Sequence, residues 1–179
     1  MPAEDTTPQL AELEDVPFVD EEGQITSAFE EQVGVYAIFN RQKVLQFIGY
    51  SRNVSLSLRQ HLVRQPEACY WVKVQTIARP SKAILEQIRD RWIAENGEVP
   101  PGNAADEALW SQPIDAKASM TAEEKATYAA GDDLTKTKTL KQVARRVEAE
   151  VLAAIATRGV KMSFRFDPKL KEEGLLNLK

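Results

Sequence analysis

The stretch that decides the fold is Gly34-Val35-Tyr36-Ala37-Ile38-Phe39, followed after a short turn by Leu45-Gln46-Phe47-Ile48-Gly49. Both runs are mainly apolar and of strand length, and the polar tetrad Asn40-Arg41-Gln42-Lys43 separates them. Two such runs joined by a few polar residues are typical of a β-hairpin. We therefore predict two paired strands over residues 34–39 and 43–48.

A helix and a third strand are predicted after the hairpin. Ser51 and Asn53 are both able to cap a helix, which then runs to about Arg64 and ends near Pro66. Residues 69–77 are rich in aromatic and β-branched side chains, which favour a strand.

A second helix follows, with Ser81 as its expected N-cap and Asn96-Gly97 as its end. Its apolar residues recur at helical spacing, at Ile84, Leu85, Ile88 and Trp92. The predicted order is β-β-α-β-α. The expected fold class is α+β, with a three-stranded antiparallel sheet and flanking helices over residues 31–103.

The segments before and after this domain have a different composition. Residues 1–30 are acidic and poor in apolar side chains, which predicts a largely disordered segment, with Val16-Pro17-Phe18-Val19 docked as a short edge segment. Residues 104–118 are loop-like, with Trp110 as a candidate anchor.

Residues 104–179 are expected to form a mainly helical C-terminal extension. Thr121-Ala122-Glu123-Glu124 is a capping box that opens a short helix, and Gly131 closes it. A longer helix covers about 134–158. Residues 160–166 then alternate between apolar and polar side chains, which predicts a final strand.

The composition indicates a protein of the cytoplasm without a membrane span. No apolar run approaches the roughly 18 residues that a transmembrane helix needs. The N-terminus has the pattern of neither a secretory signal nor a transit peptide. A single cysteine, Cys69, excludes an internal disulfide framework and points to a reducing compartment.

The net charge of −4 conceals a segregation of charge along the chain. Residues 1–31 contain ten acids and no base, whereas residues 32–101 have a net charge of +5. Residues 102–135 are again acidic, and residues 136–179 have a net charge of +6.

Basic faces attract polyanions such as DNA or RNA. Solvated charged faces beside an acidic tail explain the same pattern, and both interpretations stay open. The candidate nucleic-acid contacts are Arg52, Lys138, Lys141, Arg145 and Arg146.

The hairpin with its Gly-Val-Tyr and Phe-Ile-Gly motifs resembles the paired Gly-Ile-Tyr and Tyr-Ile-Gly strands of the GIY-YIG nuclease family. The resemblance covers residues 31–103, and β-β-α-β-α is the core order of that family. The segment 164–176 looks like a subgroup of GIY-YIG-like proteins from cyanobacteria and plastids. This likeness leads to specific expectations about the residues of the site.

The resemblance implies a tyrosine that acts as the base for an attacking water. Tyr36 matches this tyrosine, while Phe47 stands where the family usually has its second tyrosine. Tyr50, directly after Gly49, is able to supply a hydroxyl from another position. An arginine is expected to stabilise charge that develops on the phosphate.

The family's arginine usually lies eight residues after the second glycine, where this chain has Ser57. Helical geometry favours Arg59 instead. At about 100° per residue Arg59 falls within the apolar arc of the helix, and Ser57 falls on the opposite side. We therefore expect Arg59 to face the sheet and Ser57 to face water. A structural role in which Arg59 packs on the core and pairs with Glu86 is the alternative.

Glu86 on the second helix is the candidate ligand for Mg²⁺, the cofactor expected if the protein is catalytically active. The family also has an asparagine downstream of its glutamate, and both Asn96 and Asn103 are candidates. Arg52 is a candidate phosphate contact near a helix N-terminus. His61, the single histidine, is expected on the surface because its helical angle lies away from that of Arg59.

Three functions are compatible with these residues. The first is a metal-dependent endonuclease with Tyr36 as base, Arg59 as phosphate clamp and Glu86 as metal ligand. The second is a GIY-YIG-like module with a degenerate site that binds nucleic acid or a protein partner. The third is an assembly protein that uses its basic C-terminal helix. The loss of a tyrosine at Phe47 and the displaced arginine favour the second and third.

Overall fold

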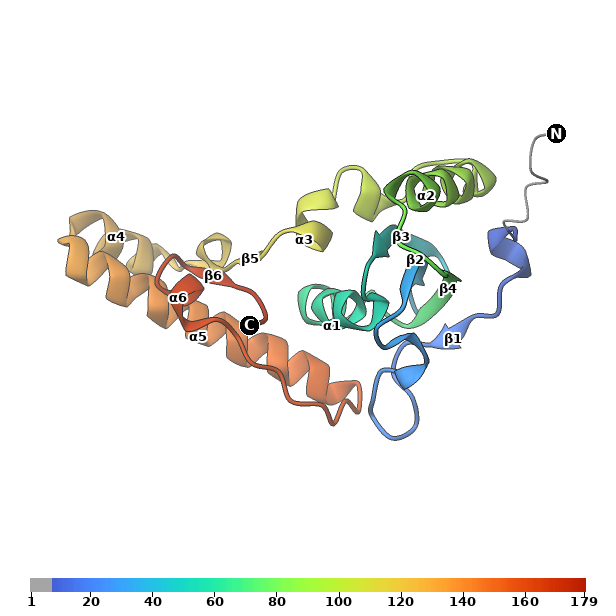
Figure 1. Cartoon of the computed structure of the whole chain (residues 1–179). Helices are drawn as coiled ribbons and strands as arrows, with labels where there is room; N and C mark the ends of the chain where they lie inside the picture. The colour runs from blue at the N-terminus through green and yellow to red at the C-terminus, as the bar shows by residue number, and fades with distance from the viewer. Residues whose placement is uncertain (1–7) are drawn as a thin grey trace.

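A four-stranded antiparallel sheet forms the centre of the fold in the computed structural model, which describes residues 8–179 (Figure 1). The strand order is β1-β4-β2-β3. The three long strands are β2 (Val33–Phe39), β3 (Leu45–Ser51) and β4 (Trp71–Ile77). They confirm the three predicted strands, and the two-residue β1 (Val16–Pro17) adds a short fourth. The α+β class is therefore correct.

The β2–β3 hairpin is closed by its polar turn. Asn40 accepts hydrogen bonds through its side-chain oxygen from the backbone N–H groups of Gln42 and Val44, and Lys43 adopts a positive φ of 61°. Such side-chain bonds to nearby backbone groups explain why Asn favours turns. The resulting register places Tyr36 of β2 opposite Gly49 of β3.

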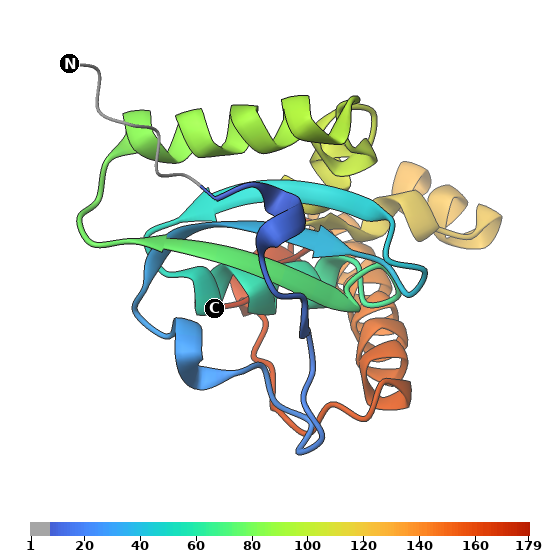
Figure 2. The ribbon, with the colours of Figure 1, turned by 90° about the vertical axis from the view of Figure 1, so that its right-hand side faces the viewer.

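Two helices cover the two faces of this sheet (Figure 2). The helix α1 (Val54–Arg64) begins at an Asn53 N-cap, and α2 (Lys82–Asn96) begins at a Ser81 N-cap. Gly97 ends α2 in the left-handed conformation, as predicted. Successive strand residues point to opposite faces of the sheet. Those on one face form an apolar cluster with residues of α1, and those on the other face form a second cluster with residues of α2.

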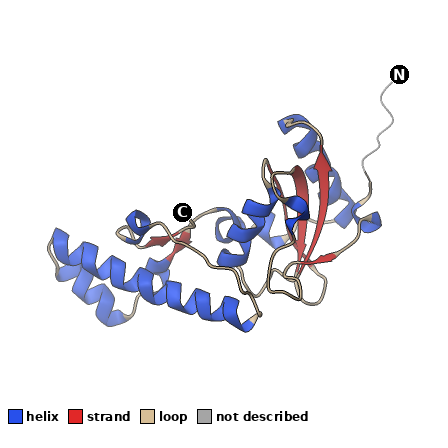
Figure 3. Ribbon diagram, turned by 60° about the horizontal axis from the view of Figure 1, so that its bottom comes forward, coloured by secondary structure: helices blue, strands red, loops and turns tan. Residues whose placement is uncertain are grey.

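The C-terminal extension forms a helical arm that starts beside α1 (Figure 3). The arm consists of α4 (Ala122–Ala130), α5 (Asp133–Thr157) and the short α6 (Pro168–Lys171). Thr121 and Glu124 form the predicted capping box of α4. The arm is joined to the sheet domain where Val63 of α1 enters the apolar cluster of α5. Within residues 8–179, none of the helices is long and apolar enough to cross a membrane.

The acidic segment before the sheet is more ordered than its composition predicts. Residues 1–7 of the expected disordered segment lie outside the described residues, but residues 8–30 pack on the domain. They contain the 3-10 helices η1 (Leu10–Glu12) and η2 (Ser27–Phe29) as well as β1. The edge segment at residues 16–19 is confirmed, with Phe18 1% exposed. A few well-placed apolar residues therefore order a segment that is mostly polar.

The expected loop at residues 104–118 also contains regular structure. It holds α3 (Glu107–Ser111), the strand β5 (Ile114–Asp115) and the start of η4 (Ala116–Ser119). A further 3-10 helix, η3 (Pro101–Asn103), precedes it. Trp110 is 3% exposed and acts as the predicted anchor.

The predicted final strand at residues 160–166 is wrong. This segment is extended but pairs with no strand of the described chain, apart from a single bridge between Phe166 and Leu178. Its apolar side chains instead pack on the clusters around α1 and α5. The last strand is β6 (Leu175–Leu176), which pairs with β5. The alternation of apolar and polar residues therefore indicated which side chains are buried and did not indicate pairing with another strand.

We expect Leu58→Ala to lower the free energy of unfolding by about 2–5 kcal/mol, because this α1 side chain is completely buried against the sheet. Leu56→Ala on the same helix is the matched control. Its side chain is 58% exposed, so the change should stay within about 0.5 kcal/mol. Urea unfolding followed by circular dichroism measures both, and equal losses would contradict this packing of α1.

Candidate functional site

An open cleft with a volume of about 510 Å³ runs along β3, the edge strand of the sheet next to β2. Tyr36 of β2 and the segment 47–50 of β3 form its floor. Its walls come from α1, α2 and the segment 99–111. The cleft therefore gathers side chains from both helices and from the segment that follows α2.

Tyr36 and His61 lie at the floor of this cleft and are joined by a hydrogen bond of 2.7 Å between the tyrosine hydroxyl and Nε2 of the imidazole. Tyr36 is 3% exposed and His61 is 4% exposed. Burial raises the pKa of Tyr36 above its ordinary value of 10, and burial lowers the pKa of His61 from 6.5 to about 3. Both side chains are therefore neutral at pH 7.

The prediction that His61 lies on the surface is wrong, and the packing of α1 explains why. The helix has two buried arcs: one, with Leu58 and Leu62, faces the sheet, and the other, with Val63, faces α5. The sequence interpretation merged these arcs into one. His61 lies at the margin of the first arc, where the rings of Phe47 and Trp110 also contact it.

Arg59 does not reach Tyr36, so the prediction for this residue is also wrong. It lies between the two arcs, where its guanidinium group donates to the Ser163 carbonyl oxygen at 2.9 Å and to the Met162 sulfur at 3.4 Å. The same group lies 4.9 Å from the ring centroid of Phe164. The proposed structural alternative, a pair with Glu86, is not formed either. Arg59 is therefore bound by residues of the C-terminal extension.

Position 57, where the family spacing expects an arginine, does face the cleft. Ser57 lies in the cleft wall and donates its hydroxyl to Ser51 Oγ at 2.7 Å. Arg64, two turns further along α1, is the cation on this wall. Its guanidinium donates to the Trp110 carbonyl oxygen and to Asn177 Oδ1, at 2.9 and 3.1 Å. Burial lowers its pKa from the ordinary value.

Two buried nitrogens in this wall lack partners. Nδ1 of His61 and Nε of Arg64 make no hydrogen bond within the described residues. Buried polar groups are usually paired, so an unpaired one calls for an explanation. Both belong to side chains that line the cleft, although the two nitrogens themselves are buried.

Glu86, the expected metal ligand, lies away from Tyr36. Its carboxylate accepts a hydrogen bond of 3.0 Å from the Tyr50 hydroxyl and lies 3.7 Å from the Lys82 ammonium. Tyr50 packs in the apolar cluster on the α2 face of the sheet, whereas Tyr36 packs on the α1 face. Tyr50 still lines the cleft together with Tyr36, but Glu86, to which its hydroxyl is bonded, does not line it.

The carboxylate that sequence reasoning passed over is Asp90, one helical turn after Glu86. Asp90 lines the cleft and pairs with Arg89 at 3.0 Å, and Glu107 also lines the cleft. Within residues 8–179, no group of three or more His, Cys, Asp or Glu side chains is arranged to hold a metal. Asp90 lines the same cleft as Tyr36, whereas the expected metal ligand Glu86 does not.

Of the two candidate asparagines, Asn103 borders the cleft and Asn96 does not. The Asn103 side-chain amide accepts from the Ile48 N–H and donates to the Ile48 carbonyl oxygen, both at 2.7 Å. It thereby pairs the free edge of β3 at the cleft. Asn96 instead donates to the Glu98 carbonyl oxygen outside the cleft.

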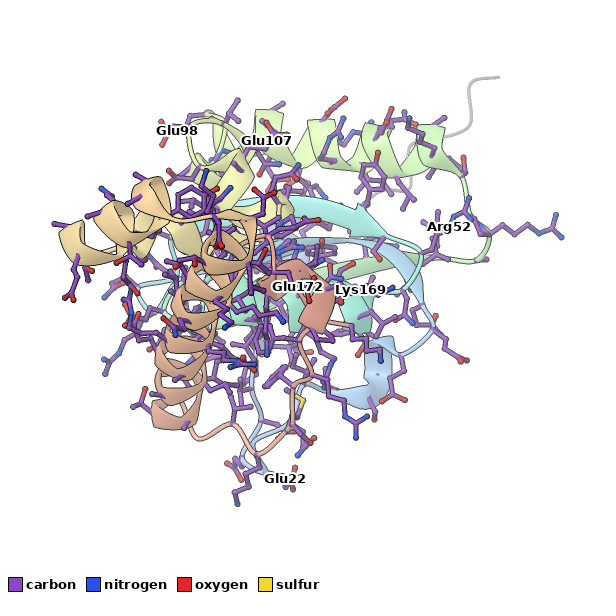
Figure 4. The ribbon with its side chains drawn as sticks, turned by 90° about the vertical axis from the view of Figure 1, so that its left-hand side faces the viewer. Glu22, Arg52, Glu98, Glu107, Lys169 and Glu172 are labelled. Carbon is purple, nitrogen blue, oxygen red and sulfur yellow. The ribbon has the colours of Figure 1, made fainter. Side chains whose placement is uncertain are left out.

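The predicted basic contacts on α5 are partly neutralised. Arg146 donates to the Glu124 carboxylate, and Lys141 lies 3.2 Å from the Glu172 carboxylate. Lys138 and Arg145 are exposed. Arg52 is also exposed, in the loop before α1, and projects away from the rest of the molecule (Figure 4). None of these five cations lines the cleft.

No family model matches this chain. A stretch of 74 residues is 46% identical to the bifunctional monothiol glutaredoxin-S16, chloroplastic, of Arabidopsis thaliana. The match covers 39% of this chain and 25% of that relative. Because the chain covers only about a quarter of the relative, the similarity does not transfer the relative's activity.

We predict that His61 makes the protein less stable in mild acid. Its pKa is about 3 in the folded state and about 6.5 in the unfolded state, so between these values only the unfolded chain binds the proton. Stability from this residue is present above pH 6.5 and is lost as the pH falls, by about 2 kcal/mol at pH 5.

Urea unfolding of the wild type and of His61→Gln at pH 7 and pH 5 tests this prediction. All other titrating groups are shared, so the loss on acidification should be about 2 kcal/mol smaller in the variant. The same loss in both proteins would show that His61 is not buried in its neutral form.

Proposed function

We propose that this chain is a nucleic-acid-binding module with a GIY-YIG-like architecture and a degenerate catalytic site. The observation that supports it best is the separation of the expected catalytic set. Tyr36 is bonded to a neutral His61, while Arg59 and Glu86 have partners elsewhere. A base that must deprotonate water needs a lowered pKa, and burial moves the pKa of Tyr36 in the opposite direction.

The cleft keeps features that suit a phosphate-bearing ligand. Arg64 and Arg89 line it from two helices, and Arg89 lies with its guanidinium carbon 5.5 Å from the Tyr50 ring centroid. Arginine is well suited to phosphate because its guanidinium presents several donors in one plane. Asp90 and Glu107 offset part of this charge, so the cleft favours a ligand that also offers hydrogen-bond donors, such as a nucleotide base.

A metal-dependent hydrolase is the second candidate, because Asp90 lines the same cleft as Tyr36 and His61. Bound Mg²⁺ would supply polarisation of a phosphodiester. The Tyr36 hydroxyl would then accept the proton of the attacking water while its own proton passes to Nε2 of His61. The low pKa of His61 makes it a weak acceptor for that proton, which is why this function ranks second.

Thiol chemistry of the kind named for the glutaredoxin relative does not suit the cysteine of this chain. Cys69 is completely buried, its thiol lies 3.6 Å from the His61 carbonyl oxygen, and burial raises its pKa. A reactive thiol needs a lowered pKa and solvent access. A single buried cysteine is compatible with the expected cytoplasm, while the relative's name places that protein in the chloroplast.

The test is incubation of the protein with branched and single-stranded DNA and RNA, with and without Mg²⁺. We expect binding that weakens with salt and no cleavage. Arg89→Gln should lower the slope of log affinity against log salt by about 0.7 if one phosphate contact of a single strand is lost. Lys125→Gln on α4 removes the same charge far from the cleft and should have no effect.

Cleavage by the wild type would contradict a degenerate site. In that case Asp90→Asn and Glu86→Gln identify the site of cleavage. A hydrolase whose active site is this cleft should lose cleavage with Asp90→Asn and keep it with Glu86→Gln. If the protein neither binds nor cleaves any of these nucleic acids, a protein partner becomes the better hypothesis.

A further inference from the structure

A second groove lies on the other side of α1, between this helix and the C-terminal segment. Its volume is about 450 Å³, and its lining includes Arg59, Arg165 and Lys179. Among the described residues, no acidic side chain lines it. The charged side chains of the groove are thus all basic, whereas in the cleft Asp90 and Glu107 accompany the arginines.

One cation of this groove, Arg59, is held in place by uncharged partners. Arg59 donates to a backbone carbonyl oxygen and lies over the ring of Phe164, and no carboxylate bonds to it in the described chain. The Lys179 N–H donates to the Arg165 carbonyl oxygen at 2.9 Å, which keeps these two residues side by side. Within residues 8–179, no acidic side chain forms an ion pair with Arg59, Arg165 or Lys179, so their charges remain available to an anion.

The alternating pattern of residues 160–166 acquires a role in this groove. Its apolar members Met162 and Phe164 pack toward the core, which turns Ser163 and Arg165 outward. Both of these polar residues line the groove. The pattern that predicted a strand thus builds one polar wall of a binding surface.

The groove and the cleft share one residue of α1. Gln60 lines both, with the pair Ser57 and Arg64 on its cleft side and Arg59 on its groove side. A ligand that leaves the cleft across Gln60 would enter the groove directly. The two hollows have the volumes of small-ligand pockets, which suit successive nucleotides of a single strand and not a duplex.

We propose that this groove binds backbone phosphates of a single nucleic-acid strand whose neighbouring nucleotides occupy the cleft. This inference rests on the proposed function and extends it to a second contact site. Proteins that hold single strands commonly combine a positively charged groove for the backbone with stacking surfaces for the bases. Arg165 and Arg59 supply that charge here.

Fluorescence anisotropy with labelled thymidine oligonucleotides of three and twelve nucleotides tests the proposal. The wild type should bind the longer oligonucleotide more tightly, because only this one reaches both hollows. Arg165→Gln should weaken binding of the longer oligonucleotide, lower its salt slope by about 0.7 for each lost phosphate contact and leave the shorter one unchanged. Arg165 is exposed, so the variant should fold, and its urea midpoint checks this.

Lys125→Gln is the charge-matched control and should behave as the wild type with both lengths. If Arg165→Gln binds the longer oligonucleotide like the wild type, the groove is not a phosphate site, although the cleft can still bind nucleic acid. If the wild type binds neither length, the proposed function and the groove fail together. These two results are distinguishable in one titration series.

Discussion

The hydrogen bond between the Tyr36 hydroxyl and His61 joins the central strand β2 to the helix α1 that covers it. Neighbouring residues of the site pack closely against these two side chains. Gly49 lies opposite Tyr36, and a Cβ added there would lie 2.8 Å from the tyrosine oxygen and 2.6 Å from the ring of Phe47. The glycine is therefore needed for the tyrosine to lie flat across the hairpin. A consequence of this tight packing is that both polar groups are held in their neutral forms.

The C-terminal extension determines which side chains of α1 reach the cleft. By packing on Val63 and binding Arg59, it occupies the arc of the helix that would otherwise be exposed. It also supplies Asn177, which holds the Arg64 guanidinium at the cleft wall. The extension is thus part of the site, and a sheet domain without it would present different cations to a ligand.

Local rules predicted the hairpin, the three long strands and both helices of the domain, because caps and turns such as Asn53, Ser81 and Gly97 act within a few residues. Helical geometry alone assigned the wrong residue of α1 to the cleft, because Ser57 lines it and Arg59 does not. The orientation of Arg59 and the burial of His61 could not be predicted, because they depend on contacts with residues far away in the sequence. Asp90 was visible in the sequence but indistinguishable from other acids of α2 until the cleft was known.

The protonation of His61 tests this account most directly. His61 is the single histidine of the chain, so the ring nitrogen signals of a ¹⁵N-labelled sample need no assignment. The buried hydrogen bond predicts a neutral imidazole whose ¹⁵N shifts stay constant from pH 7 down to pH 5. A titration with a midpoint near pH 6.5 would contradict it, since the histidine would then be accessible to water and Tyr36 would not be locked in a neutral pair.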